Sequence, residues 1–88
     1  MRGARGVPKG KPAIKEIVDE HLHRPGASPA ALTLRVRDRR APSGTAALPG
    51  TDISGVHGGF IELRDGRRVP LHRVVEVRSG GRRLWPPG

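Results

Sequence analysis

Two turn dipeptides, Asp65-Gly66 and Gly80-Gly81, divide the last third of the chain into segments too short for stable helices. Around them, apolar residues alternate with polar ones in the way typical of half-buried strands. Asp-Gly and Gly-Gly favour tight hairpins because glycine readily adopts a positive φ. This part of the chain therefore predicts short antiparallel strands, which we place at residues 60–63, 67–71, 73–78 and 82–85.

The length of the first turn decides which residues face the core. A three-residue turn with Gly66 in the left-handed region pairs Leu63 with Arg67 and Ile61 with Val69. A two-residue turn would instead mix apolar and charged residues on one face. The sequence therefore favours the three-residue turn.

The second turn predicts the faces of the last hairpin. A two-residue loop at Gly80-Gly81 pairs Ser79 with Arg82 and Val77 with Leu84. In this register Val75, Val77 and Leu84 share the core face. The opposite face is mostly charged and carries Val74, Glu76, Arg78, Arg83 and Trp85.

Apolar residues recur with the helical period in the N-terminal third. Pro12 suits the first turn of such a helix, and Pro25-Gly26 ends it. The predicted apolar stripe consists of Ile14, Ile17, Val18, His21 and Leu22.

One more strand is predicted at residues 31–38, where Leu32, Leu34 and Val36 alternate with polar residues. Residues 39–59 are predicted to form a long loop with one short strand or turn near 51–54. We expect an α+β fold, with one N-terminal amphipathic helix packed on a small, mostly antiparallel sheet of about four to five strands. Residues 1–11 are expected to form a flexible basic arm, and residues 12–88 a single small domain.

The net charge of the chain indicates which class of partner it would bind. Seventeen Lys and Arg against eight Asp and Glu give the chain a net charge of +9. Arginine donates in a planar fork that fits phosphate oxygens, so this excess favours a nucleic acid partner. The coding bias of a GC-rich genome is an alternative source of Arg, Ala, Gly and Pro, although it leaves the excess of positive charge unexplained.

Several classes of chemistry are disfavoured. The chain has no Cys and only four His, so neither a thiolate site nor a zinc site is expected, and no cofactor is implied. No apolar run is long enough to span a bilayer, and no apolar segment follows the basic start, so we expect a soluble cytoplasmic protein that does not bind a membrane.

The segment Val69-Pro70-Leu71-His72-Arg73 is the first candidate site. Pro70 cannot donate to a strand ladder, so the chain should bend there or lie at a sheet edge. His72 and Arg73 would then project from a fixed position and bind a phosphate. A structural hydrogen bond from His72 to the backbone at the bend is an alternative of about equal weight.

Other basic residues extend this candidate surface. Trp85 would stack a base if it is exposed, or complete a thin core if it is not. If their strands are neighbours, a basic stripe would follow the backbone of a nucleic acid. That stripe consists of Arg64, Arg67 and Arg68 around the first turn, Arg35 and Arg37 on the strand at 31–38, and Arg39-Arg40 after it.

The residues of the last third also resemble a known family, the RNA cyclic group end recognition domain, which is associated with RNA repair. The resemblance covers most of the chain from about Ala13, and its specific part is the last third. It follows Asp65-Gly66 and consists of Val69, Pro70, His72, Arg73, Val74, Gly81 and Trp85.

The resemblance implies a module that recognises RNA ends bearing a cyclic phosphate and works beside an enzyme such as an RNA ligase or phosphoesterase. His72 and Arg73 would contact the terminal phosphate. The alternative is a small metal-independent RNA-processing phosphodiesterase that uses His72, with His57 as its acid or base partner. A third option is a structural component of a ribonucleoprotein that needs only charge. The expected RNA-binding residues are His72, Arg73, Arg64, Arg67, Arg68, Arg35, Arg37, Arg78, Arg83 and Trp85.

Overall fold

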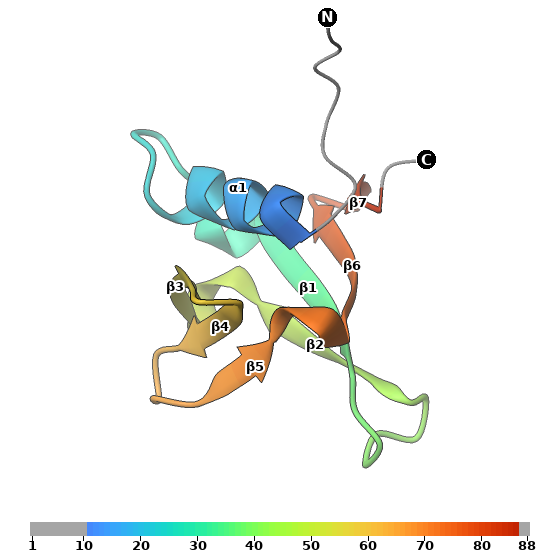
Figure 1. Cartoon of the computed structure of the whole chain (residues 1–88). Coiled ribbons are helices and arrows are strands. Elements are labelled where there is room, and N and C mark those ends of the chain that lie inside the picture. The colour runs from blue at the N-terminus through green and yellow to red at the C-terminus, as the bar shows by residue number, and fades with distance from the viewer. Residues whose placement is uncertain (1–10, 87–88) are drawn as a thin grey trace, which may run out of the picture.

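The computed structural model describes residues 11–86, which form one helix and two antiparallel sheets (Figure 1). The helix is α1, Lys11–Leu22. The first sheet has the strand order β2-β1-β6-β7 and the second has the order β3-β4-β5. The strands are β1 Leu32–Arg37, β2 Thr45–Pro49, β3 Ile53–His57, β4 Phe60–Leu63, β5 Arg68–Pro70, β6 Val74–Ser79 and β7 Arg82–Trp85.

The helix is held by the apolar stripe that the sequence predicts. Ile14 and Val18 are fully buried, and Ile17 and Leu22 pack against the core at its margin. His21, on the same stripe, lies with Nδ1 2.8 Å from the Ile17 carbonyl oxygen and with Nε2 3.0 Å from the Ser79 hydroxyl. The helix contacts both β3 and β7, so it covers one side of each sheet. The predicted flexible arm lies outside the described residues except for Lys11, which begins the helix.

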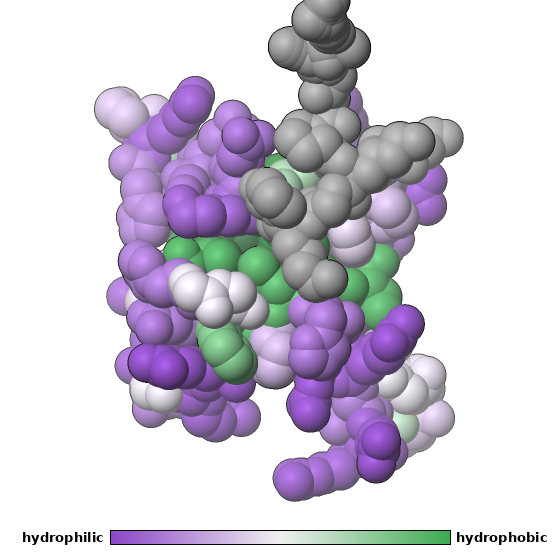
Figure 2. Space-filling model, viewed as in Figure 1, coloured by the Kyte–Doolittle hydropathy of each residue, from purple (hydrophilic) through white to green (hydrophobic). Residues whose placement is uncertain are grey.

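The core lies between the helix and the inner faces of the two sheets. Leu32, Leu34 and Val36 of β1 are buried, and the residues between them are not, as the alternating pattern predicts. From the second sheet, Ile53 of β3 and Ile61 of β4 are buried in the same core. Burying each such side chain stabilises the fold by about 1.5–3 kcal/mol. On the side shown in Figure 2, apolar side chains form a band between hydrophilic surfaces.

The prediction for the first hairpin is confirmed. Ile61 pairs with Val69, and Gly66 has a φ of +93° in the three-residue turn. The backbone N–H of Leu63 donates to the carbonyl of Arg67 at 2.8 Å, which closes the predicted pair.

The expected α+β class is confirmed, but the expected number of strands is wrong, because within residues 11–86 seven strands form two sheets instead of four to five in one. The predicted long loop at 39–59 contains both β2 and β3. These strands are rich in Ala, Gly and Ser, whose small side chains give little strand signal. They form because β2 pairs with β1 and β3 pairs with β4.

Two bulges change the predicted faces of β6 and β7. The pairing with β1 shifts between Arg35 and Val36, so Val74, not Val75, is buried beside Val77. The Ser79 to Arg82 pair is confirmed, but Val77 then pairs with Trp85, not with Leu84. A bulge inserts one unpaired residue and reverses which side chains face the core.

Trp85 is therefore not on the exposed face with Arg78 and Arg83, where the unbulged register placed it. Its side chain is half-buried and packs against the core cluster. Of the two roles that the sequence allowed for Trp85, a base-stacking surface or part of the core, the structure supports the core.

Candidate functional site

The bend at Pro70 is the structural basis of the candidate site. Pro70 ends β5 at the edge of the three-stranded sheet, and a 3-10 turn, Leu71–Arg73, follows it. Leu71 is buried, and its backbone N–H donates to the carbonyl of Gly59 at 2.9 Å. Because Leu71 points inward within this tight turn, His72 and Arg73 point outward and are exposed. The predicted bend and edge position are both confirmed.

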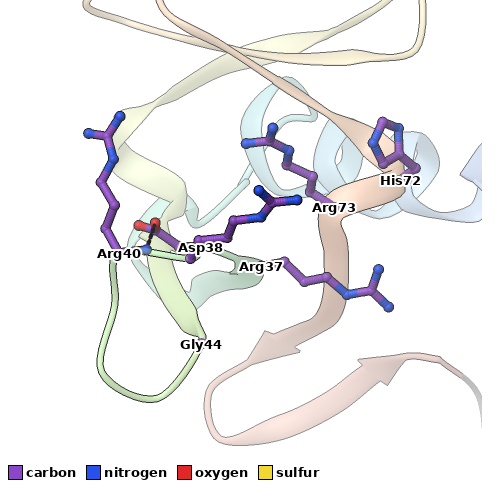
Figure 3. Close-up of a pocket in the computed structure, with 7 residues that line it drawn as sticks. Arg37, Asp38, Arg40, Gly44, His72 and Arg73 are labelled. Atoms are coloured by element: carbon purple, nitrogen blue, oxygen red, sulfur yellow. Dashed lines mark hydrogen bonds between the residues drawn. The ribbon is translucent and has the colours of Figure 1, made fainter.

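A second segment, the loop 38–44 between β1 and β2, lies across a pocket from this turn (Figure 3). The backbone N–H of Asp38 donates to the carbonyl of Gly44, and that of Gly44 donates to the carbonyl of Ala41, both at 2.9 Å. Gly44 has a φ of +81°, which favours glycine. These bonds fix the loop that carries Arg39 and Arg40.

The pocket between them has a volume of about 660 Å³ and is strongly basic. We call it the arginine pocket. Figure 3 shows Arg40 on one side of it and His72 and Arg73 on the other. Its lining consists of Arg37, Asp38, Arg39, Arg40, Gly44, His72 and Arg73.

The guanidinium groups of this pocket have no partner among residues 11–86. No hydrogen bond or ion pair of the described chain engages the side chains of Arg37, Arg39, Arg40 or Arg73. Asp38 is the one acid in the lining, and its Oδ1 accepts the backbone N–H of Arg40 at 2.9 Å. Four cationic groups thus surround an open pocket that contains a single carboxylate.

His72 makes no hydrogen bond within the described residues, so the structural alternative for this residue is not supported there. The structure also does not bring His57 to the same pocket. A β-carbon added at Gly55 would lie 3.2 Å from Nε2 of His57 and 3.8 Å from Nε2 of His23, so these two rings lie together over β3. Within residues 11–86, no group of three or more His, Asp or Glu side chains is arranged to hold a metal ion.

Two predicted residues, Arg67 and Arg68, lie beside the arginine pocket and not in it. They line an adjoining hollow between β2 and β5. Arg67 Nε donates to Asp65 Oδ2 at 2.8 Å, and Arg68 Nε lies 3.5 Å from Glu62 Oε2. The backbone N–H of Arg67 lowers the pKa of the Asp65 carboxyl, and its guanidinium lowers it further.

Three other predicted arginines form a separate surface on the outer face of the four-stranded sheet. Arg35 Nε and Arg78 Nη1 lie 3.9 and 3.7 Å from the two oxygens of Glu76, and Arg78 pairs with Arg83 across the strands. We call Arg35, Glu76, Arg78 and Arg83 the sheet face. Arg37 lies on the same side of β1 as Arg35, so it links the sheet face to the arginine pocket.

The structure places Arg64 away from the arginine pocket and brings Arg39 and Arg40 into it, and the sequence did not predict this difference. Arg64 Nε donates to the carbonyl of Thr51 at 2.9 Å, and it lines a different hollow with Asp52 and Asp65. Arg39 and Arg40 were grouped with the stripe but not with His72. The Asp38 side chain, which suits a tight turn, was the signal that this loop folds back.

No helix in the described part of the chain is long and apolar enough to cross a membrane.

Comparisons with known proteins identify relatives by sequence. A UPF0248 protein from Methanopyrus kandleri is 37% identical over 67 residues, which cover 76% of this chain and 89% of that protein. A UPF0248 protein from Archaeoglobus fulgidus is 36% identical over 52 residues, which cover 59% of this chain and 75% of that protein. No family model matches the chain, and no solved structure matches it.

Proposed function

The chain belongs to the UPF0248 family, and from its arginine pocket we propose that it is a binding module that holds the phosphorylated end of an RNA, a 2',3'-cyclic phosphate included. One observation carries this proposal. Four guanidinium groups surround a pocket in which they have no partner among the described residues. Four arginine side chains that line one open pocket without a carboxylate partner in the described chain create a positive potential there, so the arrangement suits an anionic ligand.

A phosphate fits the chemistry of this pocket better than a carboxylate. Arginine donates through a planar fork, and phosphate offers several acceptor oxygens to more than one fork at a time. His72 adds a ring N–H that donates to the same anion. We assign His72 and Arg73 to the terminal phosphate, with Arg37, Arg39 and Arg40 as the other arginines of the lining around it.

The sheet face supports a polymer and not an isolated phosphate. Arg35, Arg78 and Arg83 lie on three neighbouring strands, and Arg37 connects them to the pocket. The ion pairs of Arg35 and Arg78 with Glu76 are long, at 3.9 and 3.7 Å, and the two arginine side chains are exposed, so these pairs contribute little and yield readily to phosphates. The RNA behind the end would follow this surface.

The test compares three RNAs of one sequence at fixed salt, ending in 2',3'-cyclic phosphate, 3'-phosphate or 3'-hydroxyl. We expect both phosphorylated ends to bind more tightly than the hydroxyl end, by about tenfold or more, because hydrogen bonds to charged groups contribute about 1.5–3 kcal/mol. Equal affinities for the three ends would contradict end recognition.

Arg73→Ala, with Arg82→Ala as its control, assigns the effect to the pocket. Both arginines are exposed, and neither has an ion pair in the described chain, but Arg82 lines no pocket described above. We expect Arg73→Ala to remove most of the preference for the phosphorylated end. Arg82→Ala should leave the preference unchanged, since it removes the same charge from another place.

The arginine pocket is lined by one imidazole, that of His72, and its one carboxylate, Asp38, accepts a hydrogen bond from the backbone N–H of Arg40. General acid and base catalysis of phosphodiester cleavage needs an acid and a base that are both positioned at the phosphate, so we expect binding without turnover. Metal-independent opening of the cyclic phosphate that is lost in His72→Ala would instead indicate the phosphodiesterase alternative. As a binding module, the protein would present its RNA end to an RNA ligase or phosphoesterase.

A further inference from the structure

A slot adjoins the arginine pocket where the two sheets face each other without a covering strand. It lies between β2 and β5, the edge strands of their sheets, and has a volume of about 350 Å³. It shares Arg37, Asp38, Arg40 and Arg73 with the arginine pocket. The two hollows therefore adjoin each other, and we call the second one the inter-sheet slot.

The wall of the slot is apolar and its rim is cationic. Val36 and Leu63 are core residues that reach it, and Ala46, Leu48 and Val69 are half-buried there. Arg67 and Arg68 stand at the rim away from the arginine pocket. Half-buried apolar side chains beside a cationic rim suit an occupant that has both an apolar and an anionic part.

We propose that the inter-sheet slot takes the base and ribose of the terminal nucleotide whose phosphate lies in the arginine pocket. This inference rests on the proposed function and names the group next to the phosphate. A nucleobase has two apolar faces and polar edges, which match an apolar wall with guanidinium groups at the rim. A volume of about 350 Å³ is within the range of sites for small ligands.

The same opening is poorly suited to an added protein strand. Strand addition needs a row of free backbone N–H groups along an edge. Pro49 ends β2 and Pro70 ends β5, and each lacks that donor. The cationic rim also favours an anionic ligand over a neutral peptide.

The test uses four forms of one short RNA that vary two features independently. The last nucleoside is adenosine or an abasic ribose, and its 3' position carries a phosphate or a hydroxyl. We expect the base to increase the affinity of the phosphorylated RNA by about tenfold, and the phosphate to increase it further. The RNA concentration at half saturation is measured for each form at one salt concentration.

This design distinguishes a failure of the slot proposal from a failure of the proposed function. An effect of the base below about twofold on the phosphorylated RNA would overturn the slot and leave the end-phosphate proposal standing. An absent phosphate effect would overturn the proposed function, whatever the base does.

A pair of variants on β2 locates the base. Ala46 faces the slot, and Ala47, its neighbour, is exposed on the opposite side of the strand. Ala46→Phe should fill the slot and abolish the advantage of adenosine over the abasic ribose while the phosphate advantage remains. Ala47→Phe should change neither. A base advantage that survives in folded Ala46→Phe would overturn the proposal, and if that variant fails to fold, the four RNAs still decide it on the native chain.

Discussion

The arginines of this chain differ in what their guanidinium groups already contact. Arg35 and Arg78 share Glu76, and Arg67 is bonded to Asp65, whereas Arg37 and Arg73 have no such carboxylate within residues 11–86. An arginine with a carboxylate partner must break that contact before it binds a phosphate. The unpaired arginines avoid this competition, so at the scale of single residues they are the better candidates for ligand contact.

Trp85→Ala tests whether this residue belongs to the core. Trp85 is half-buried against the core cluster, so its removal should lower the free energy of unfolding by about 2 kcal/mol, less than for a fully buried tryptophan. Urea denaturation measures the effect. Phe60→Ala, which removes the more exposed aromatic ring, at 39% exposure, serves as the control and should change stability less. Unchanged stability with weaker RNA binding would make Trp85 a stacking surface instead.

Asp65 gives a prediction on pH. Its pKa in the folded chain lies below the ordinary value of 3.8, mainly because the backbone N–H of Arg67 donates to it. The interaction stabilises the fold above pH 3.8, and that contribution is lost as the pH falls through the lowered pKa. An NMR titration of the Asp65 carboxyl should have its midpoint below 3.8.

Arg67→Gln separates the causes of this shift, because it keeps the backbone donor and removes the guanidinium. The midpoint should rise and still remain below 3.8. A midpoint at the ordinary value in the native chain would contradict the described turn.

At the scale of elements, the sequence predicted what depends on local pattern. The helix stripe, the β1 alternation and the Gly66 turn follow from spacing and from glycine's freedom at positive φ. The bulges at Val75 and Leu84 depend on pairing with another strand, and no local pattern contains that information. This is why the faces of β6 and β7 were wrong while their bounds were nearly right.

The candidate site likewise has one part that local sequence predicts and another that depends on contacts between distant segments. Pro70 fixed the bend, so His72 and Arg73 were expected to project outward. That Arg39 and Arg40 lie across from them depends on β1 and β2 forming a hairpin, and β2 has too little apolar content to be recognised alone. Arg64 could not be set apart, because its bond to the Thr51 carbonyl joins segments distant in the sequence.

Gly50→Ala tests how the connections between the strands pack. Gly50 is buried in the 3-10 turn before β3, and an added β-carbon would collide with the carbonyl oxygen of Pro29 and lie 2.8 Å from the β-carbon of Leu32. We expect a loss of about 1–3 kcal/mol in the free energy of unfolding, measured by thermal or urea denaturation. Thr51→Ala, at the exposed next position, should change it by less than about 0.5 kcal/mol. Equal stability of the two variants would contradict this close approach.

At the scale of the whole molecule, the helix covers one side of the fold and leaves the outer face of the four-stranded sheet open. The arginine pocket and the sheet face meet at Arg37. An RNA end held in the pocket can therefore lead onto the sheet face without crossing the helix. The two surfaces would divide the task, because the pocket distinguishes ends while the sheet face adds affinity for any RNA.

The dependence of binding on salt separates these two roles. Each phosphate contact to single-stranded RNA adds about 0.7 to the slope of log K against log salt. Arg35→Gln combined with Arg83→Gln should therefore lower the slope by about 1.4 and weaken all RNAs alike, leaving the ratio between phosphorylated and hydroxyl ends unchanged. Arg37→Gln should lower both the slope and the ratio, because Arg37 lines the pocket and lies beside the sheet face on the same side of β1 as Arg35. Fluorescence anisotropy over a range of salt concentrations measures both quantities. If the double variant lost the end preference, the pocket and the sheet face would have to be one site, and the path proposed for the RNA would be wrong.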